Sequence, residues 1–150
     1  MKFAASLAIA ALASALATPA SAQFAKPEDA VKYRQNALFV MSQHFGRIGA
    51  MANGRAPYDA AAAVQNAEIV ATMARLPWAG FTPNTEGLSP KAKADIWKEQ
   101  AKFREGAEKL VAESTKLVAA AKTNNLDNLK KAFGETAATC KACHDNFRSN

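Results

Sequence analysis

Two cysteines and a histidine stand close together near the C-terminal end of the chain, in the order Cys140-Lys141-Ala142-Cys143-His144. On a helix, the third and fourth residues after Cys140 lie about 300° and about 400° around the axis, so the three side chains share one face. Two thiols one turn apart can each add to one of two neighbouring vinyl groups of a porphyrin, while the imidazole ligates the iron. This C-x-x-C-H motif therefore predicts one covalent haem on Cys140 and Cys143, with His144 as the axial ligand.

Other uses of a C-x-x-C pair fit this position less well. A thiol–disulfide oxidoreductase carries the pair at a helix N-terminus, where the helix dipole lowers the thiol pKa, but Cys140 and Cys143 lie toward the opposite end of their predicted helix. A structural zinc site needs four ligands, and the second histidine of the chain, His44, belongs to another predicted helix. A disulfide between them would distort a helix and leave His144 without a role. Haem attachment is the interpretation that uses all three residues.

The opposite face of the iron needs a ligand from upstream or none at all, because only six residues follow His144. Imidazole and thioether groups are the usual sixth ligands, and they occur at His44, Met41, Met51 and Met73. His44 lies about 240° around its helix from Leu38 and therefore off the inward face, whereas Met41 lies on that face. A methionine there packs into a core more often than it binds a metal. We expect a five-coordinate iron under hydrocarbon side chains, with Met41 as the alternative sixth ligand.

Apolar periodicity and turn residues predict the helices that must position this motif. A proline followed by two acidic residues suits a helix N-terminus, so a first helix is predicted over residues 27–54. Apolar repeats predict further helices over 58–76, over 89–122 and from about 127 to near the C-terminus. Residues 77–87 are rich in turn formers and predict a loop. This pattern indicates an all-α fold, an antiparallel up-down-up-down four-helix bundle, with the haem near the C-terminal helix.

The first residues are typical of a secretory signal peptide. Lys2 supplies a positive charge, an Ala- and Leu-rich stretch follows, and residues 20–22 form an A-x-A cleavage site. We expect cleavage of residues 1–22, which leaves residues 23–150 as one exported, periplasmic domain without a membrane anchor. An uncleaved anchor is the alternative, although the apolar stretch is short and Ala-rich for a membrane span.

The net charge of +6 is spread along the chain and forms no basic block. This distribution favours solvated helix faces over a nucleic-acid-binding surface. It would attract acidic partners, but it identifies no redox partner. The sequence also supplies no distal acid–base pair for a peroxidase, so we expect no enzymatic activity.

Several short segments are similar to those of one known family. A haem motif at the extreme C-terminus also separates this chain from ordinary small cytochromes c, which carry the motif near the N-terminus. The segments that carry the similarity are residues 23–35, 56–60, 76–78, 85–87 and 140–145. With them, the chain after residue 22 resembles cytochrome c prime, the high-spin four-helix-bundle branch of the class II c-type cytochromes.

The resemblance implies roles for residues outside the haem motif. Leu38 is implied to cover the vacant distal face of the iron, and Arg34 and Gln35 to bind a haem propionate. Arg148 is implied to lie beside His144, four residues later on the same helix face. The residues implied to line the haem edge are Trp78, Phe81, Thr85 and Glu86.

The resemblance also implies binding of small gases. Nitric oxide would enter past Leu38 and loosen the bond to His144, with Arg148 near the vacated proximal face, and carbon monoxide would bind more weakly because the leucine must move. A leucine donates no hydrogen bond to dioxygen, so oxygen carriage is disfavoured. We expect sequestration of nitric oxide in the periplasm, electron transfer as a second activity, and a homodimer through the first helix. The alternative function is a low-spin electron carrier with Met41 as the sixth ligand.

Overall fold

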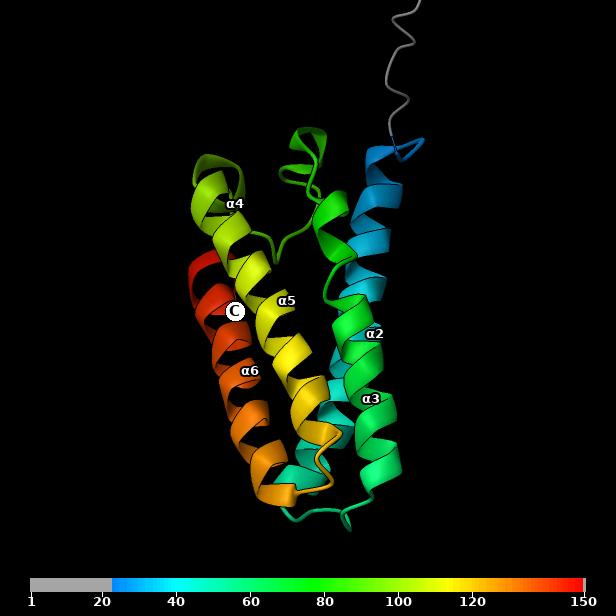
Figure 1. Ribbon diagram of the computed structural model, residues 1–150. Coiled ribbons are helices and arrows are strands. Elements are labelled where there is room, and N and C mark those ends of the chain that lie inside the picture. Colours follow the sequence, from blue (N-terminus) through cyan, green and yellow to red (C-terminus); the bar gives the residue numbers. More distant parts are fainter. Residues whose placement is uncertain (1–22, 150) are drawn as a thin grey trace, which may run out of the picture.

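Four long helices run alternately in opposite directions through the molecule (Figure 1). The computed structural model describes residues 23–149, so the predicted signal peptide, residues 1–22, lies outside the described residues. None of the helices in residues 23–149 is both long enough and apolar enough to cross a lipid bilayer. The prediction of an all-α, antiparallel four-helix bundle is confirmed, and its helices are α2 (Pro27–Ala52), α3 (Ala60–Met73), α5 (Gln100–Ala121) and α6 (Leu126–Phe147).

Local signals in the sequence set most helix ends. Helix α2 begins at Pro27 and carries two acidic residues in its first turn, as the sequence predicted. The side chain of Asp59 accepts a hydrogen bond from the backbone N–H of Ala62 at 3.0 Å and caps α3. Asn125 caps α6 in the same way. The prediction of a helix over 58–76 was too long at its C-terminal end, because α3 ends at Met73.

The prediction of one continuous helix over residues 89–122 is wrong in its first turns. Helix α5 begins at Gln100 and is preceded by one helical turn, α4 (Asp95–Lys98), and by a non-helical segment. In that segment Ala92 forms an isolated antiparallel bridge with Arg148, just beyond the end of α6. Hydrogen bonds to this distant part of the chain hold the segment in place, so local helix signals do not decide its conformation.

The connection between α3 and α4, predicted as a loop, contains regular structure. It contains two short 3-10 helices, η2 (Pro77–Gly80) and η3 (Pro83–Thr85). A Cβ atom at Gly80 would lie 2.5 Å from the carbonyl oxygen of Ala30 on α2. Because only glycine permits this approach, η2 can pack directly against the first turns of α2.

The bundle is solidly packed in the half that contains the α2–α3 and α5–α6 connections. Ile48, Ala63, Leu117 and Leu129 each have no exposed surface there. Small residues on α3, such as Ala67, let the neighbouring helices approach closely. The opposite half of the bundle is the part that encloses a cavity.

Two aromatic rings mark the boundary between the packed half and the cavity. Phe45 of α2 stacks on Phe133 of α6, with ring centroids 4.5 Å apart. A Cβ at Gly49 would lie 2.8 Å from the Phe133 ring, so a glycine at this position makes room for the aromatic side chain. Helices α2 and α6, which face one another across the cavity, are thus in direct contact where the cavity ends.

Candidate functional site

A cavity of about 660 Å³ opens between α2, α5 and α6. Its volume falls within the range of roughly 300–1,000 Å³ that is typical of sites for small molecules and cofactors. Of the residues that the sequence assigned to haem binding, all except Thr85 and Glu86 line it. Those at the wall are Arg34, Gln35, Leu38, Trp78, Phe81, Cys140, Cys143, His144 and Arg148.

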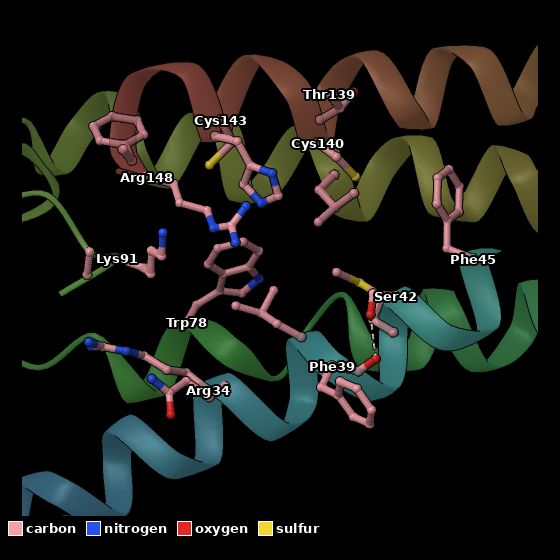
Figure 2. Close-up of a pocket in the computed structure, with 18 of the residues that line it drawn as sticks. Arg34, Phe39, Ser42, Phe45, Trp78, Lys91, Thr139, Cys140, Cys143 and Arg148 are labelled. Atoms are coloured by element: carbon pink, nitrogen blue, oxygen red, sulfur yellow. Dashed lines mark hydrogen bonds between the residues drawn. The ribbon is translucent and has the colours of Figure 1, made fainter. Parts of the chain in front are cut away.

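Helix α6 contributes the two thiols and the imidazole. Cys140 and Cys143 are half-buried, neither is in a disulfide, and both face the cavity across from α2 (Figure 2). Burial raises the pKa of both thiols, and the neighbouring Cys143 raises that of Cys140 further. Gly106 of α5 lies opposite, where a Cβ would be 3.9 Å from the sulfur of Cys143. The thiols therefore sit as neutral groups in a mainly apolar wall.

His144 lies at the same wall, one residue after the second thiol. Partial burial lowers the pKa of His144, Arg148 lowers it further, and Asp145 opposes the shift. The carboxylate of Asp145 is itself paired with the ammonium of Lys141. A neutral imidazole has the free lone pair that a metal ligand requires, so the surroundings of His144 suit ligation of iron.

The wall formed by α2 is largely hydrocarbon. Leu38, Met41 and Phe45 line the cavity from successive turns of the helix. Ser42 also lines it, but its hydroxyl donates a hydrogen bond to the carbonyl of Phe39 at 2.7 Å. This wall therefore offers few polar groups to a small ligand that faces the thiols and the imidazole.

Arg34 is the buried charge of the site, with 2% of its surface exposed. Its Nη1 donates hydrogen bonds of 2.8 Å to the carbonyl of Gly80 and of 2.8 Å to the hydroxyl of Thr85. Its Nη2 is buried and has no partner among the described residues. Burial lowers the pKa of Arg34, and its guanidinium lies 4.3 Å from the centre of the Phe81 ring. A buried guanidinium with a free nitrogen at a cavity wall requires an acceptor, and a carboxylate fits it best.

Thr85 and Glu86 do not line the cavity, although the sequence predicted both at the haem edge. Thr85 has no exposed surface, accepts its hydrogen bond from Arg34 and donates one to the carbonyl of Thr82 at 2.7 Å. Glu86 is exposed and does not line the cavity. Gln35 does line it, and its side chain also reaches the hydroxyl of Ser89 at 3.4 Å. Thr85 therefore contacts a residue of the cavity wall through its hydrogen bond with Arg34.

Aromatic rings form one end of the cavity. Trp78 contacts Phe81 and Phe103, with ring centroids 6.2 Å and 5.7 Å apart. Phe103 also packs edge-on against Phe147 at 5.2 Å. The indole N–H of Trp78 donates to the carbonyl of Ala74 at 2.6 Å, which fixes the ring. Sequence reasoning did not assign Phe103 or Phe147 to the site, because their spacing matched ordinary core positions.

Arg148 lines the cavity, but its backbone lies beyond the end of α6 and not within the helix, as the sequence predicted. Helix α6 ends at Phe147, and Arg148 has an extended backbone with φ −119° and ψ 132°. Arg148 is therefore not on the helix face of His144, as the sequence suggested. Its N–H still bonds the carbonyl of His144 at 3.0 Å, and its side chain lines the cavity beside Cys143 (Figure 2).

Of the four candidate sixth ligands, Met41 is the one that lines the cavity. The Nδ1–H of His44 instead donates a 2.8 Å hydrogen bond to the amide oxygen of Asn66 on α3. Met51 and Met73 do not line the cavity either. Lys91 does line it, although no sequence pattern singled this residue out.

These features together fit a flat, mainly apolar group that carries a metal and acidic substituents. The thiols can bond to it covalently, the imidazole of His144 can ligate its metal, and Arg34 can bind a carboxylate. A haem has all of these parts, so the residues present fit a c-type haem.

Comparisons with known proteins agree with this site. A family model described as Cytochrome C' matches residues 29–148. A cytochrome c' from Alcaligenes xylosoxydans xylosoxydans is 50% identical over 126 residues, which cover 84% of this chain and 98% of that protein. The solved structure of cytochrome c' from Rubrivivax gelatinosus has a TM-score of 0.81 and 44% sequence identity, over 85% of this chain and 100% of that chain.

One similar solved structure contains a small gas. It is a nitric oxide complex of a leucine-to-alanine mutant of cytochrome c prime from Alcaligenes xylosoxidans. It has a TM-score of 0.80 and 48% sequence identity, over 85% of this chain and 99% of that chain.

Proposed function

Because the chain belongs to the cytochrome c prime family, whose members hold a c-type haem with iron, we propose that it sequesters nitric oxide in the periplasm. One haem is bound covalently through Cys140 and Cys143, and His144 is its axial ligand. Nitric oxide complexes of relatives support gas binding as the function. The predicted signal peptide supports export.

One observation carries this proposal: the thiols and imidazole of α6 face a hydrocarbon wall on α2 across one cavity. A haem bound there supplies an iron coordination position that a diatomic gas can use. Leu38 restricts access to that position from the α2 side. The hydroxyl of Ser42 is committed to the Phe39 carbonyl, so it gives little stabilisation to a polar ligand such as dioxygen. Nitric oxide binds ferrous iron strongly without a hydrogen-bond donor.

The decisive experiment uses protein purified from a host that attaches c-type haem. Mass spectrometry should give the mass of the mature chain beginning at Gln23 plus one haem. The absorption spectrum should show the broad bands of high-spin iron and should change when nitric oxide is added. A bare polypeptide mass, or an oxidised iron that already has six ligands, would contradict the proposal.

A second candidate function is electron transfer by a low-spin haem. Met41 is buried at the cavity wall and carries a thioether that can ligate iron. The same spectrum separates the two functions, because a sharp reduced alpha band and a sulfur-to-iron band in the oxidised protein would indicate methionine ligation. Replacement of Met41 by leucine should abolish those bands if they are present.

We infer a homodimer that forms through the outer face of α2. Phe39 and Val40 are large apolar residues on this helix, and 62% and 37% of their surfaces are exposed. Contiguous apolar surface of this kind on a helix is typical of protein–protein contacts.

A further inference from the structure

The charged side chains at the wall of the cavity all have the same sign. Arg34, Lys91 and Arg148 line it, and no aspartate or glutamate among residues 23–149 does so. Each cation at a wall of low polarity favours an anionic partner, because the surrounding protein screens charge less than water does. Arg34 alone can bind one anionic group. The cavity therefore has more positive charge than a single carboxylate needs.

The backbone of Lys91 is held in place by the C-terminal end of the chain. Its carbonyl accepts a 3.0 Å hydrogen bond from the N–H of Ser149, and the N–H of Lys93 donates to the carbonyl of Phe147 at 3.1 Å. These bonds flank the bridge between Ala92 and Arg148. The backbone of Lys91 is thus hydrogen-bonded to the residues at the end of α6, the helix that carries the thiols.

The ammonium of Lys91 is available for a ligand. It takes part in none of the five ion pairs between the described residues. By contrast, Lys93 donates its Nζ to the carbonyl of Asp145 at 3.0 Å. Figure 2 shows Lys91 at the same end of the cavity as Arg34, whose Nη2 is also without a partner in residues 23–149.

We propose that Lys91 binds a second carboxylate of the group held in this cavity, beside the carboxylate bound by Arg34. This inference rests on the proposed function, because a haem carries two propionates at one edge. Arg34 binds one propionate from a buried position, and Lys91 binds the other from the solvent side. Since Lys91 is anchored to Ser149 and its neighbours, the second contact also fixes the haem edge relative to the end of α6.

The test compares Lys91→Met in the haem-loaded protein with two other variants. Methionine has a similar length but neither charge nor a hydrogen-bond donor, so one propionate should lose its partner. In resonance Raman spectra of the reduced protein, a propionate bending band should shift in Lys91→Met. The shift should be absent or reversed in Lys91→Arg, which keeps the charge. Lys98→Met is the matched control, because Lys98 is an exposed lysine of α4 that does not line the cavity.

An unchanged propionate band in Lys91→Met would overturn the inference, and so would an equal shift in Lys98→Met. Unfolding in urea accompanies each spectrum, and a Lys91→Met variant that is less stable but keeps the band would show a structural role only. Failure of the proposed function has a different signature. In that case the unmutated protein would lack covalent haem in mass spectrometry, before any variant is compared.

Discussion

Leu38 is the residue of α2 that the sequence proposed as a cover for the iron, and it lies at the cavity wall between Arg34 and Met41. We expect Leu38→Ala to speed and tighten carbon monoxide binding to the reduced protein by roughly tenfold, since relief of about 1.4 kcal/mol has that effect. Flash photolysis and equilibrium titration measure both quantities. Leu88→Ala is the control, because Leu88 is an exposed leucine that does not line the cavity. Equal affinities in the Leu38 variant and the unmutated protein would remove Leu38 from the entry path.

Thr85 supports Arg34 through one buried hydroxyl. Thr85→Val keeps the shape of the side chain but removes the acceptor for Arg34 and the donor to Thr82. We expect the free energy of unfolding to fall by about 1–3 kcal/mol, the cost of buried polar groups that lose a partner. Equilibrium unfolding in urea measures this change. Thr85→Ser retains the hydroxyl and should lose much less, and similar losses in both variants would show that packing, not hydrogen bonding, is the role of Thr85.

Among single residues, the thiols and the imidazole of the site could be predicted from the sequence. Some of the residues that surround them could not. The spacing of Cys140, Cys143 and His144 is local, so helix geometry alone placed them on one face. Thr85 was expected at the edge of the cavity, but it lies behind Arg34 because η3 folds against α2. Lys91 carries no sequence signal, since its position depends on hydrogen bonds to residues more than fifty positions away.

Among the elements, the approach of η2 to α2 depends on the glycine at position 80. Gly80→Ala would place a Cβ 2.5 Å from a backbone carbonyl and 2.9 Å from the Cβ of Arg34. We expect this overpacking to lower the free energy of unfolding by about 1–3 kcal/mol. Equilibrium unfolding in urea compares it with Gly134→Ala.

Gly134 is the matched control because it lies within α6, and a Cβ added there would have no neighbouring atom within 4 Å. Alanine there should raise the free energy of unfolding by about 0.5–1 kcal/mol, since it restricts the unfolded chain and favours helix. If both variants changed stability in the same direction, close contact between η2 and α2 would not be the reason for a glycine at position 80.

The elements that the sequence predicted best are those fixed by local signals. Pro27 and the acidic residues after it start α2 where the pattern placed it, and α6 begins at Leu126, one residue before its predicted start. The segment before α5 was predicted as helix because its side chains repeat at helical intervals. Its pairing with Arg148 is a contact between distant parts of the chain, and periodicity contains no information about such pairing.

For the molecule as a whole, the outer face of α2 determines the expected assembly. Val40→Asp would place a charge in the apolar contact inferred for the homodimer, so we expect a monomer in sedimentation equilibrium. Ala119→Asp adds the same charge to the exposed face of α5 and should leave the dimer intact. A monomer at all concentrations of the unmutated protein would contradict the inferred assembly.

The overall bundle could be predicted because its four apolar stripes and short connections leave few alternatives. The division of that bundle into a packed half and a cavity could not be predicted, because Phe45 and Phe103 occupy the same kind of position in the heptad pattern as core residues. Both rings line the cavity and both pack against neighbouring rings, and three-dimensional packing decides this arrangement.

The contact between Gly49 and Phe133 has a consequence for how relatives of this chain can diverge. The ring occupies the space that any side chain at position 49 would need. The two positions should therefore change together: a relative with alanine in place of Gly49 is expected to carry a smaller residue in place of Phe133. A family alignment in which the two positions vary independently would show that the helices can shift apart to admit both side chains.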